Sequence, residues 1–270
     1  MTIALIAALA LASAPAPASA SVPLRGSGPW TVRVADNLCA MGRKFDGVGG
    51  PVMLVVKAPL LGDNYEITSV APVKGKAGPL RGSVKILGAQ ADGAVPITFL
   101  AFNSSFSRRI VRFSIDGEQF KLRDAGPVLA LDMGREGRQA FAVNGLPKAL
   151  DKLEECTRGL RASFGIDQIL VDSVAIKPKI DVVALFKTED YPQEAMRNGE
   201  QGTVAVLGFV TPDGRFRDCK VIESSKSRSL DEVTCKIFVA RARYTPAIGP
   251  DGRKIRYPDY NRITWIMPNS

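Results

Sequence analysis

The residues available for chemistry are four cysteines without any histidine. The chain has 270 residues and carries Cys39, Cys156, Cys219 and Cys235, but no His at all. Without histidine, Ser/His and Cys/His nucleophile pairs are impossible and the commonest general base is missing. No cysteines are spaced as C-x-x-C, which argues against a structural zinc site. We therefore predict no catalytic residue, no metal ligand and no cofactor, and we expect that the protein is not an enzyme.

One minor alternative stays open. An enzyme with its site in the first domain would have to use carboxylate or Ser/Lys chemistry, because histidine is absent. The acidic residues of that part, such as Asp116, Asp124 and Asp132, share no spacing typical of a catalytic pair. A polar pocket with clustered carboxylates would be the feature that revives this alternative.

The cysteines suggest an oxidising compartment, because an even number of cysteines in an exported chain is typical of disulfide bonds. Four cysteines allow three pairings, and we favour Cys39 with Cys156 and Cys219 with Cys235, one bridge in each domain. In the chain-entropy description the longer loop would contribute about 4 to 5 kcal/mol and the shorter loop about 3 kcal/mol. Four buried thiols are the alternative.

The N-terminus has the composition of an export signal. An apolar run from Ile3 to Ala12 is followed by a Pro/Ala/Ser stretch that ends in Ala18-Ser19-Ala20, a pattern that signal peptidase accepts. The run is too short to cross a bilayer, which takes about 20 apolar residues. We predict that residues 1–20 are a cleaved signal peptide and that the mature protein is periplasmic, although no Lys or Arg precedes the apolar run.

Charge and composition indicate a globular protein with two domains. The chain is 46% hydrophobic and 23% charged, with a formal net charge of +9. Its basic residues are spread along the chain rather than clustered, so we expect no nucleic-acid partner and at most peripheral contact with a membrane. We predict a domain of unknown function over residues 21–166, a linker over 167–188 and a second domain over 189–270.

The first domain has the pattern of short strands. Apolar residues alternate with polar ones, or form short runs, in several segments bounded by Gly, Pro, Asn and Asp. These segments are residues 30–34, 52–57, 65–70, 83–87, 97–102 and 109–115. Leu146, Leu150, Leu153 and Cys156 then recur at helical spacing. The fold class is therefore α+β, with a mainly antiparallel β domain that is closed by a helix carrying Cys156.

The second domain has clear local signals. Pro192 and Gly199 bound a short helix, and a strand over residues 202–210 leads into a Thr-Pro-Asp-Gly turn. A return strand follows to Ser224, and a capping box that begins at Ser229 starts a second helix to about residue 243. The last strand fits within residues 256–266. The order is helix, hairpin, helix and strand.

Several short motifs in this order carry a resemblance. They are Tyr191-Pro192, Gly199, Gly202, Thr211-Pro212-Asp213-Gly214, Ser224-Ser225, Leu230-Asp231 and Arg241-Ala242-Arg243-Tyr244-Thr245-Pro246. Together they resemble the C-terminal domain of TonB-family energy transducers, over about residues 189–270. The resemblance implies two helices packed on a three-stranded antiparallel sheet. It also implies a protein partner, such as a segment of an outer-membrane receptor, that adds as a strand at the sheet edge.

By position the matching edge is the last strand, over residues 261–266. We expect Arg262, Thr264 and Trp265 to face or flank the partner, while the alternative is that Ile263 and Trp265 pack on the helices. The resemblance links the protein to TonB-dependent transport across the outer membrane. Because the sequence shows no membrane anchor, no His and no Pro-rich spacer, the alternative is a structural or self-associating envelope protein, for example a homodimer, with no part in energy transduction.

Overall fold

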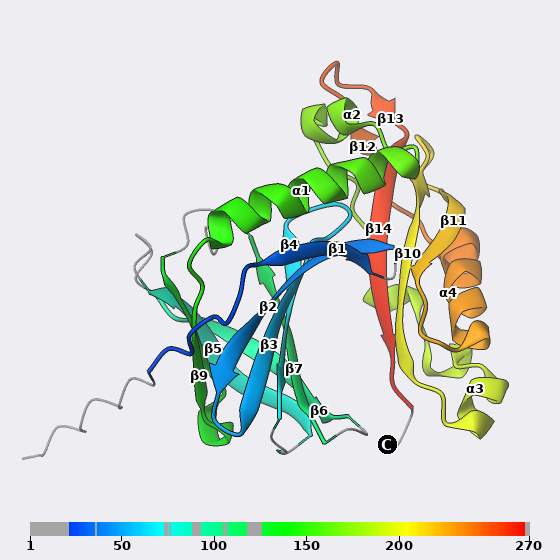
Figure 1. The fold of residues 1–270 in the computed structure, drawn as a ribbon. Coiled ribbons are helices and arrows are strands. Elements are labelled where there is room, and N and C mark those ends of the chain that lie inside the picture. Colours follow the sequence, from blue (N-terminus) through cyan, green and yellow to red (C-terminus); the bar gives the residue numbers. More distant parts are fainter. Residues whose placement is uncertain are drawn as a thin grey trace, which may run out of the picture.

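The protein is an α+β structure in which a β domain and a smaller mixed domain lie against each other (Figure 1). The computed structural model describes residues 22–267, except residues 36, 73, 74, 76, 88–92, 105, 106 and 118–125. The predicted signal peptide lies outside the described residues. No helix in the described part of the chain is long and apolar enough to cross a membrane.

The N-terminal domain is a nine-stranded antiparallel sheet with the order β1-β2-β3-β4-β7-β6-β5-β8-β9. Its strands are β1 (Thr31–Ala35), β2 (Leu38–Gly47), β3 (Gly50–Lys57), β4 (Asn64–Ala71), β5 (Gly78–Leu87), β6 (Val95–Asn103), β7 (Arg109–Asp116), β8 (Val128–Asp132) and β9 (Arg138–Ala142). The segment before β1 closes this sheet into a barrel, because Leu24 pairs with Phe141 of β9 and Gly26 pairs with Phe45 of β2.

A long helix covers the barrel, as predicted from the helical spacing of its apolar residues. Helix α1 (Leu146–Ser163) begins after Gly145, which has a left-handed φ of 76°, and lies across the barrel in Figure 1. Leu146, Leu150 and Leu153 are buried on its inner face. The predicted disulfide between Cys39 of β2 and Cys156 of α1 is present, with 6.0 Å between the Cα atoms. The helix is thus covalently fixed to the first long strand.

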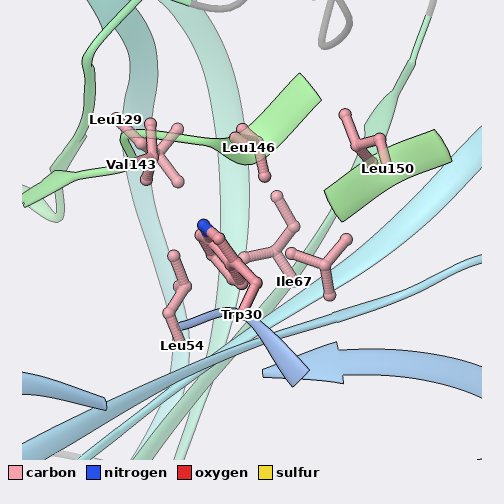
Figure 2. A pocket seen from close by; sticks show the side chains of 8 residues that line it. Trp30, Leu54, Ile67, Leu129, Val143, Leu146 and Leu150 are labelled. Carbon is pink, nitrogen blue, oxygen red and sulfur yellow. The ribbon is translucent and has the colours of Figure 1, made fainter. Parts of the chain in front are cut away.

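A small pocket under α1 belongs to the apolar core. Figure 2 shows the Trp30 ring among the side chains that line the pocket. The lining residues are Trp30, Leu54, Val56, Ile67, Leu129, Val143, Leu146 and Leu150. None of these side chains ionises, so the pocket offers no carboxylate or nucleophile, and we assign no chemistry to it.

The C-terminal domain has a three-stranded antiparallel sheet with the order β11-β10-β14. Its elements are α3 (Gln193–Asn198), β10 (Gly202–Val210), β11 (Phe216–Glu223), α4 (Arg228–Arg241), β12 (Ala247–Ile248), β13 (Lys254–Ile255) and β14 (Tyr257–Trp265). Helices α3 and α4 pack on the face that is turned away from the barrel (Figure 1). Leu230, Ile237 and Phe238 of α4 are all buried in the core of this domain.

The second predicted disulfide joins β11 to α4, because Cys219 and Cys235 bond with 5.7 Å between their Cα atoms. The predicted turns are also present. Gly199 ends α3 with a φ of 64°, and Gly214 takes a φ of 80° between β10 and β11. These positive φ values are readily adopted only by glycine.

The N-cap of α4 differs from the sequence prediction. The helix begins at Arg228, and the cap is Ser227, whose Oγ accepts a hydrogen bond from the Leu230 amide at 3.3 Å. The predicted cap, Ser229, lies inside the first turn. Ser227 has extended φ and ψ angles, which a capping residue requires. Asp231 accepts from the Ser224 and Ser225 hydroxyls at 2.6 and 2.7 Å, which fixes the turn before the helix.

The segment predicted as a linker is packed against the C-terminal domain. It contains α2 (Gln168–Ser173) and the 3-10 helix η3 (Val183–Leu185), and a second 3-10 helix, η4 (Thr188–Asp190), begins at its last residue. Between them, Ile176 bridges to Ile248 and Lys179 bridges to Thr245. Leu185 joins the core of the C-terminal domain. The segment is therefore held along its length by contacts with the domain that follows it.

The two domains share an apolar cluster. Leu38, Leu60 and Ile166 from the N-terminal side pack with Ala205, Leu207 and Ile222 of the sheet. All six side chains are buried, at 4% exposed or less. The sheet β11-β10-β14 therefore lies between helices on one face and the barrel on the other, which leaves its edges as the backbone surfaces that can meet a partner.

Candidate interaction edge

Strand β14 has one paired edge and one open edge. It pairs with β10 at nine successive positions, from Tyr257 opposite Val210 to Trp265 opposite Gly202, without a bulge. In the part of the chain that the structure describes, no further strand pairs with β14. Every second residue of β14 therefore directs its backbone N–H and C=O away from β10.

Two observations identify which residues these are. Pro258 has no N–H, and a proline within a strand is accommodated where its nitrogen faces the free edge. The Thr203 and Thr264 hydroxyl oxygens lie 3.1 Å apart across the ladder, which is typical of a pair that does not exchange backbone hydrogen bonds. Both observations indicate that the even-numbered residues of β14 direct their backbone N–H and C=O toward the open edge. Tyr260, Arg262 and Thr264 thus offer outward donors and acceptors.

The opposite edge of the sheet is less suited to strand addition. On β11, Asp218 has a φ of 56°, and the pairing with β10 shifts register between Leu207 and Phe209. Asp218 and the exposed Arg217 and Lys220 place charge along the strand. Bulges and charged side chains of this kind discourage pairing with another chain. The open edge of β14 is therefore the better candidate.

The three side chains predicted to face or flank a partner have different surroundings. Thr264 is exposed. Trp265 is 6% exposed, its Nε1 donates to Thr234 Oγ1 at 2.9 Å, and its ring packs edge-on against Phe186 and Tyr191. Its side chain thus belongs to the helix-side core, which is the alternative that the sequence left open. As an odd-numbered residue, Trp265 also directs its backbone N–H and C=O toward β10, so it offers no group at the open edge.

Arg262 is engaged within the protein. Its guanidinium forms ion pairs with Glu66 of β4 and, at 3.1 Å, with Glu223 of β11. Burial alone would lower the pKa of Arg262, but the carboxylates of Glu66 and Glu223 raise that pKa above its usual value. Arg262 therefore stays charged and holds β14 against the N-terminal domain, and its backbone is the part that remains available at the edge.

Arg262 belongs to an interdomain charge cluster of three cations and two carboxylates. Lys57 pairs with Glu223 at 2.9 Å and lies 4.0 Å from Glu66, while Arg112 lies 3.5 Å from Glu66. This cluster could not be predicted from the sequence, because Glu66 and Arg262 are separated by 196 positions and no local pattern connects them. The only local hint is Glu66 itself, the one charged residue of β4.

A half-buried carboxylate lies on the helix side of β14. Asp259 accepts hydrogen bonds from the Tyr244 hydroxyl and from Asn261 Nδ2, both at 2.6 Å. Burial raises the pKa of Asp259, and these hydrogen bonds offset only part of that rise. Since the folded pKa lies above the unfolded value of about 3.9, the carboxyl favours the folded state most at low pH. This contribution is lost as the pH rises through the folded pKa.

Asp259→Asn tests this pH dependence. We expect the unfolding free energy of the native protein, relative to the variant, to fall as the pH rises above about 4, because Asn cannot ionise. Urea unfolding at several pH values measures the difference. Glu232→Gln is the control, since Glu232 forms an exposed pair with Arg228, and exposed pairs contribute little to stability. A flat profile for Asp259→Asn would contradict the prediction.

Residues 187–267 match the family described as the Gram-negative bacterial TonB protein C-terminal. The match spans α3, β10, β11, α4 and β14, so this part of the chain is a TonB C-terminal domain. Comparison with curated proteins finds no match for the chain. TonB C-terminal domains are non-catalytic modules for protein-protein interaction and are typical of the periplasm, which gives this chain a protein-interaction role.

Proposed function

We propose that this is a periplasmic protein, exported by a cleaved signal peptide, that binds an extended segment of a partner at the open edge of β14. The partner is a segment of an outer-membrane receptor, which links the protein to TonB-dependent transport, and the protein is not an enzyme. The observation that carries the proposal is an unpaired edge in a TonB C-terminal domain, with outward backbone groups at Tyr260, Arg262 and Thr264. Strand addition uses such groups for affinity.

The test places a photoreactive residue at Thr264 in the full-length protein and identifies what is crosslinked in envelope extracts. Thr264→Pro, with the photoreactive residue moved to the exposed Ile266, should abolish capture, because it removes an outward N–H. Pro258 is also an even-numbered residue of β14, so the strand already contains one proline whose nitrogen faces the open edge. Thr264→Val is the control, since it removes the hydroxyl and keeps the backbone donor.

The proposal predicts crosslinks to one extended receptor segment, retained in the Val variant and lost in the Pro variant. Crosslinks only between copies of this protein would instead support a self-associating envelope protein. Equal capture by the Pro and Val variants would show that the backbone edge of β14 is not the binding surface.

A further inference from the structure

Strands β6 and β7 of the barrel carry outward-facing apolar and charged side chains. On β6, Phe99 and Ala101 point into the core, whereas Leu100 and Phe102 are 45% and 37% exposed. On the neighbouring β7, Arg112 also faces outward, and its guanidinium carbon lies 5.5 Å from the centre of the Phe102 ring. These three residues, Leu100, Phe102 and Arg112, are called the barrel wall below. They combine a cation with exposed apolar surface.

The ion pairs show where the wall lies relative to β14. Lys57 of β3 meets Glu223 of β11, and Glu66 of β4 meets Arg262 of β14. Moving across the sheet from β11 to β14 therefore corresponds to moving across the barrel from β3 to β4. The next barrel strand is β7, followed by β6. A strand added to β14 would lie about 4.8 Å further in the same direction, toward β7 and the barrel wall.

The charge of the wall indicates what it would bind. The interdomain cluster has three cations, Lys57, Arg112 and Arg262, for the two carboxylates of Glu66 and Glu223. Arg112 is the most exposed of the three, at 32% of its side chain, although its Nε is buried 3.5 Å from Glu66. A carboxylate of the partner would balance this excess charge. Beside it, Leu100 and Phe102 fit an apolar side chain.

We propose that the N-terminal domain reads the side chains of the strand added at β14. Arg112 binds an acidic side chain of the partner segment, and Leu100 with Phe102 binds an apolar side chain two residues away, since alternate residues of a strand face the same way. This inference rests on the proposed function, because it requires strand addition at β14. It gives the barrel domain a role in partner selection.

The test measures binding of labelled strand-length peptides to the whole protein by fluorescence anisotropy. One peptide carries Glu and Leu two positions apart in an alternating Thr/Val background, a second has Lys in place of Glu, and a third has Ser in place of Leu. We expect the first peptide to bind about three to ten times more tightly than the others. Arg112→Gln should remove the preference for Glu over Lys, whereas Arg112→Lys should retain it. Phe102→Thr should remove the preference for Leu over Ser.

The outcomes separate this inference from the proposed function. If Thr264→Pro weakens all peptides while the native protein shows no preference among them, strand addition stands and the barrel wall is not used. If Thr264→Pro changes nothing, or if no peptide binds, both ideas fail. If the protein dimerises and Phe102→Thr abolishes the dimer, the barrel wall is an interface between two copies of the protein, which would overturn the inference. Thermal unfolding of each variant checks that the fold is retained, because Arg112 also belongs to the interdomain charge cluster.

Discussion

Glu66→Gln is expected to be the most damaging single change in the interdomain charge cluster, with a loss of about 3 kcal/mol in the free energy of unfolding. Glu66 is 6% exposed and is the one carboxylate that all three cations approach. Its removal leaves Lys57, Arg112 and Arg262 with Glu223 alone. Arg262→Gln should cost less, because two cations and two carboxylates then remain.

The measurement is urea unfolding followed by tryptophan fluorescence. Trp30 lies in the N-terminal domain and Trp265 in the C-terminal domain, so single Trp→Phe backgrounds report each domain separately. Glu232→Gln, in an exposed pair with Arg228, should cost well under 1 kcal/mol. The double variant Glu66→Gln with Arg262→Gln should recover part of the stability. A larger loss for Arg262→Gln than for Glu66→Gln would contradict this account.

The C-terminal domain could be predicted from the sequence because local signals determine its elements. Gly199 and Gly214 adopt the positive φ that their turns require, and Pro192 precedes α3 as expected. The cap of α4 was placed two residues too late, at Ser229, since several serines near Asp231 compete for the role and only their backbone angles decide between them. The disulfide of this domain was predicted by placing one bridge in each domain, and it is present.

The N-terminal domain was less predictable, because the order of its strands in the sheet depends on contacts between residues that are distant in the sequence. Strands β2, β8 and β9 were not among the predicted strands. In β2, Leu38 to Met41 are four consecutive buried residues without alternation. The closure of the barrel by Leu24 and Gly26 depends on pairing with β9 and β2, which no local pattern shows. The same is true of the contact between Glu66 and Arg262. At the candidate site, the sequence could predict the last strand. It could not predict that the N-terminal domain covers one face of the sheet to which this strand belongs.

Replacing Cys39 and Cys156 together by Ala is expected to lower the free energy of unfolding by about 4 to 5 kcal/mol, the largest effect among these predictions. The bridge spans 117 positions, so its removal frees a long loop in the unfolded chain. The corresponding change at Cys219 and Cys235, which are 16 positions apart, should cost about 3 kcal/mol. Alanine is chosen because Cys39 is 1% exposed and a serine there would bury a hydroxyl.

Urea unfolding in the Trp→Phe backgrounds would assign each loss to its domain. Because the bridges lie in different domains, we expect the Cys39 and Cys156 change to act first on the Trp30 signal and the other change on the Trp265 signal. Adding a reductant to the native protein should reproduce both losses, whereas the fourfold Ala variant should not respond. A chain that depends on two such bridges needs an oxidising compartment, so native stability under reducing conditions would count against the proposed export to the periplasm.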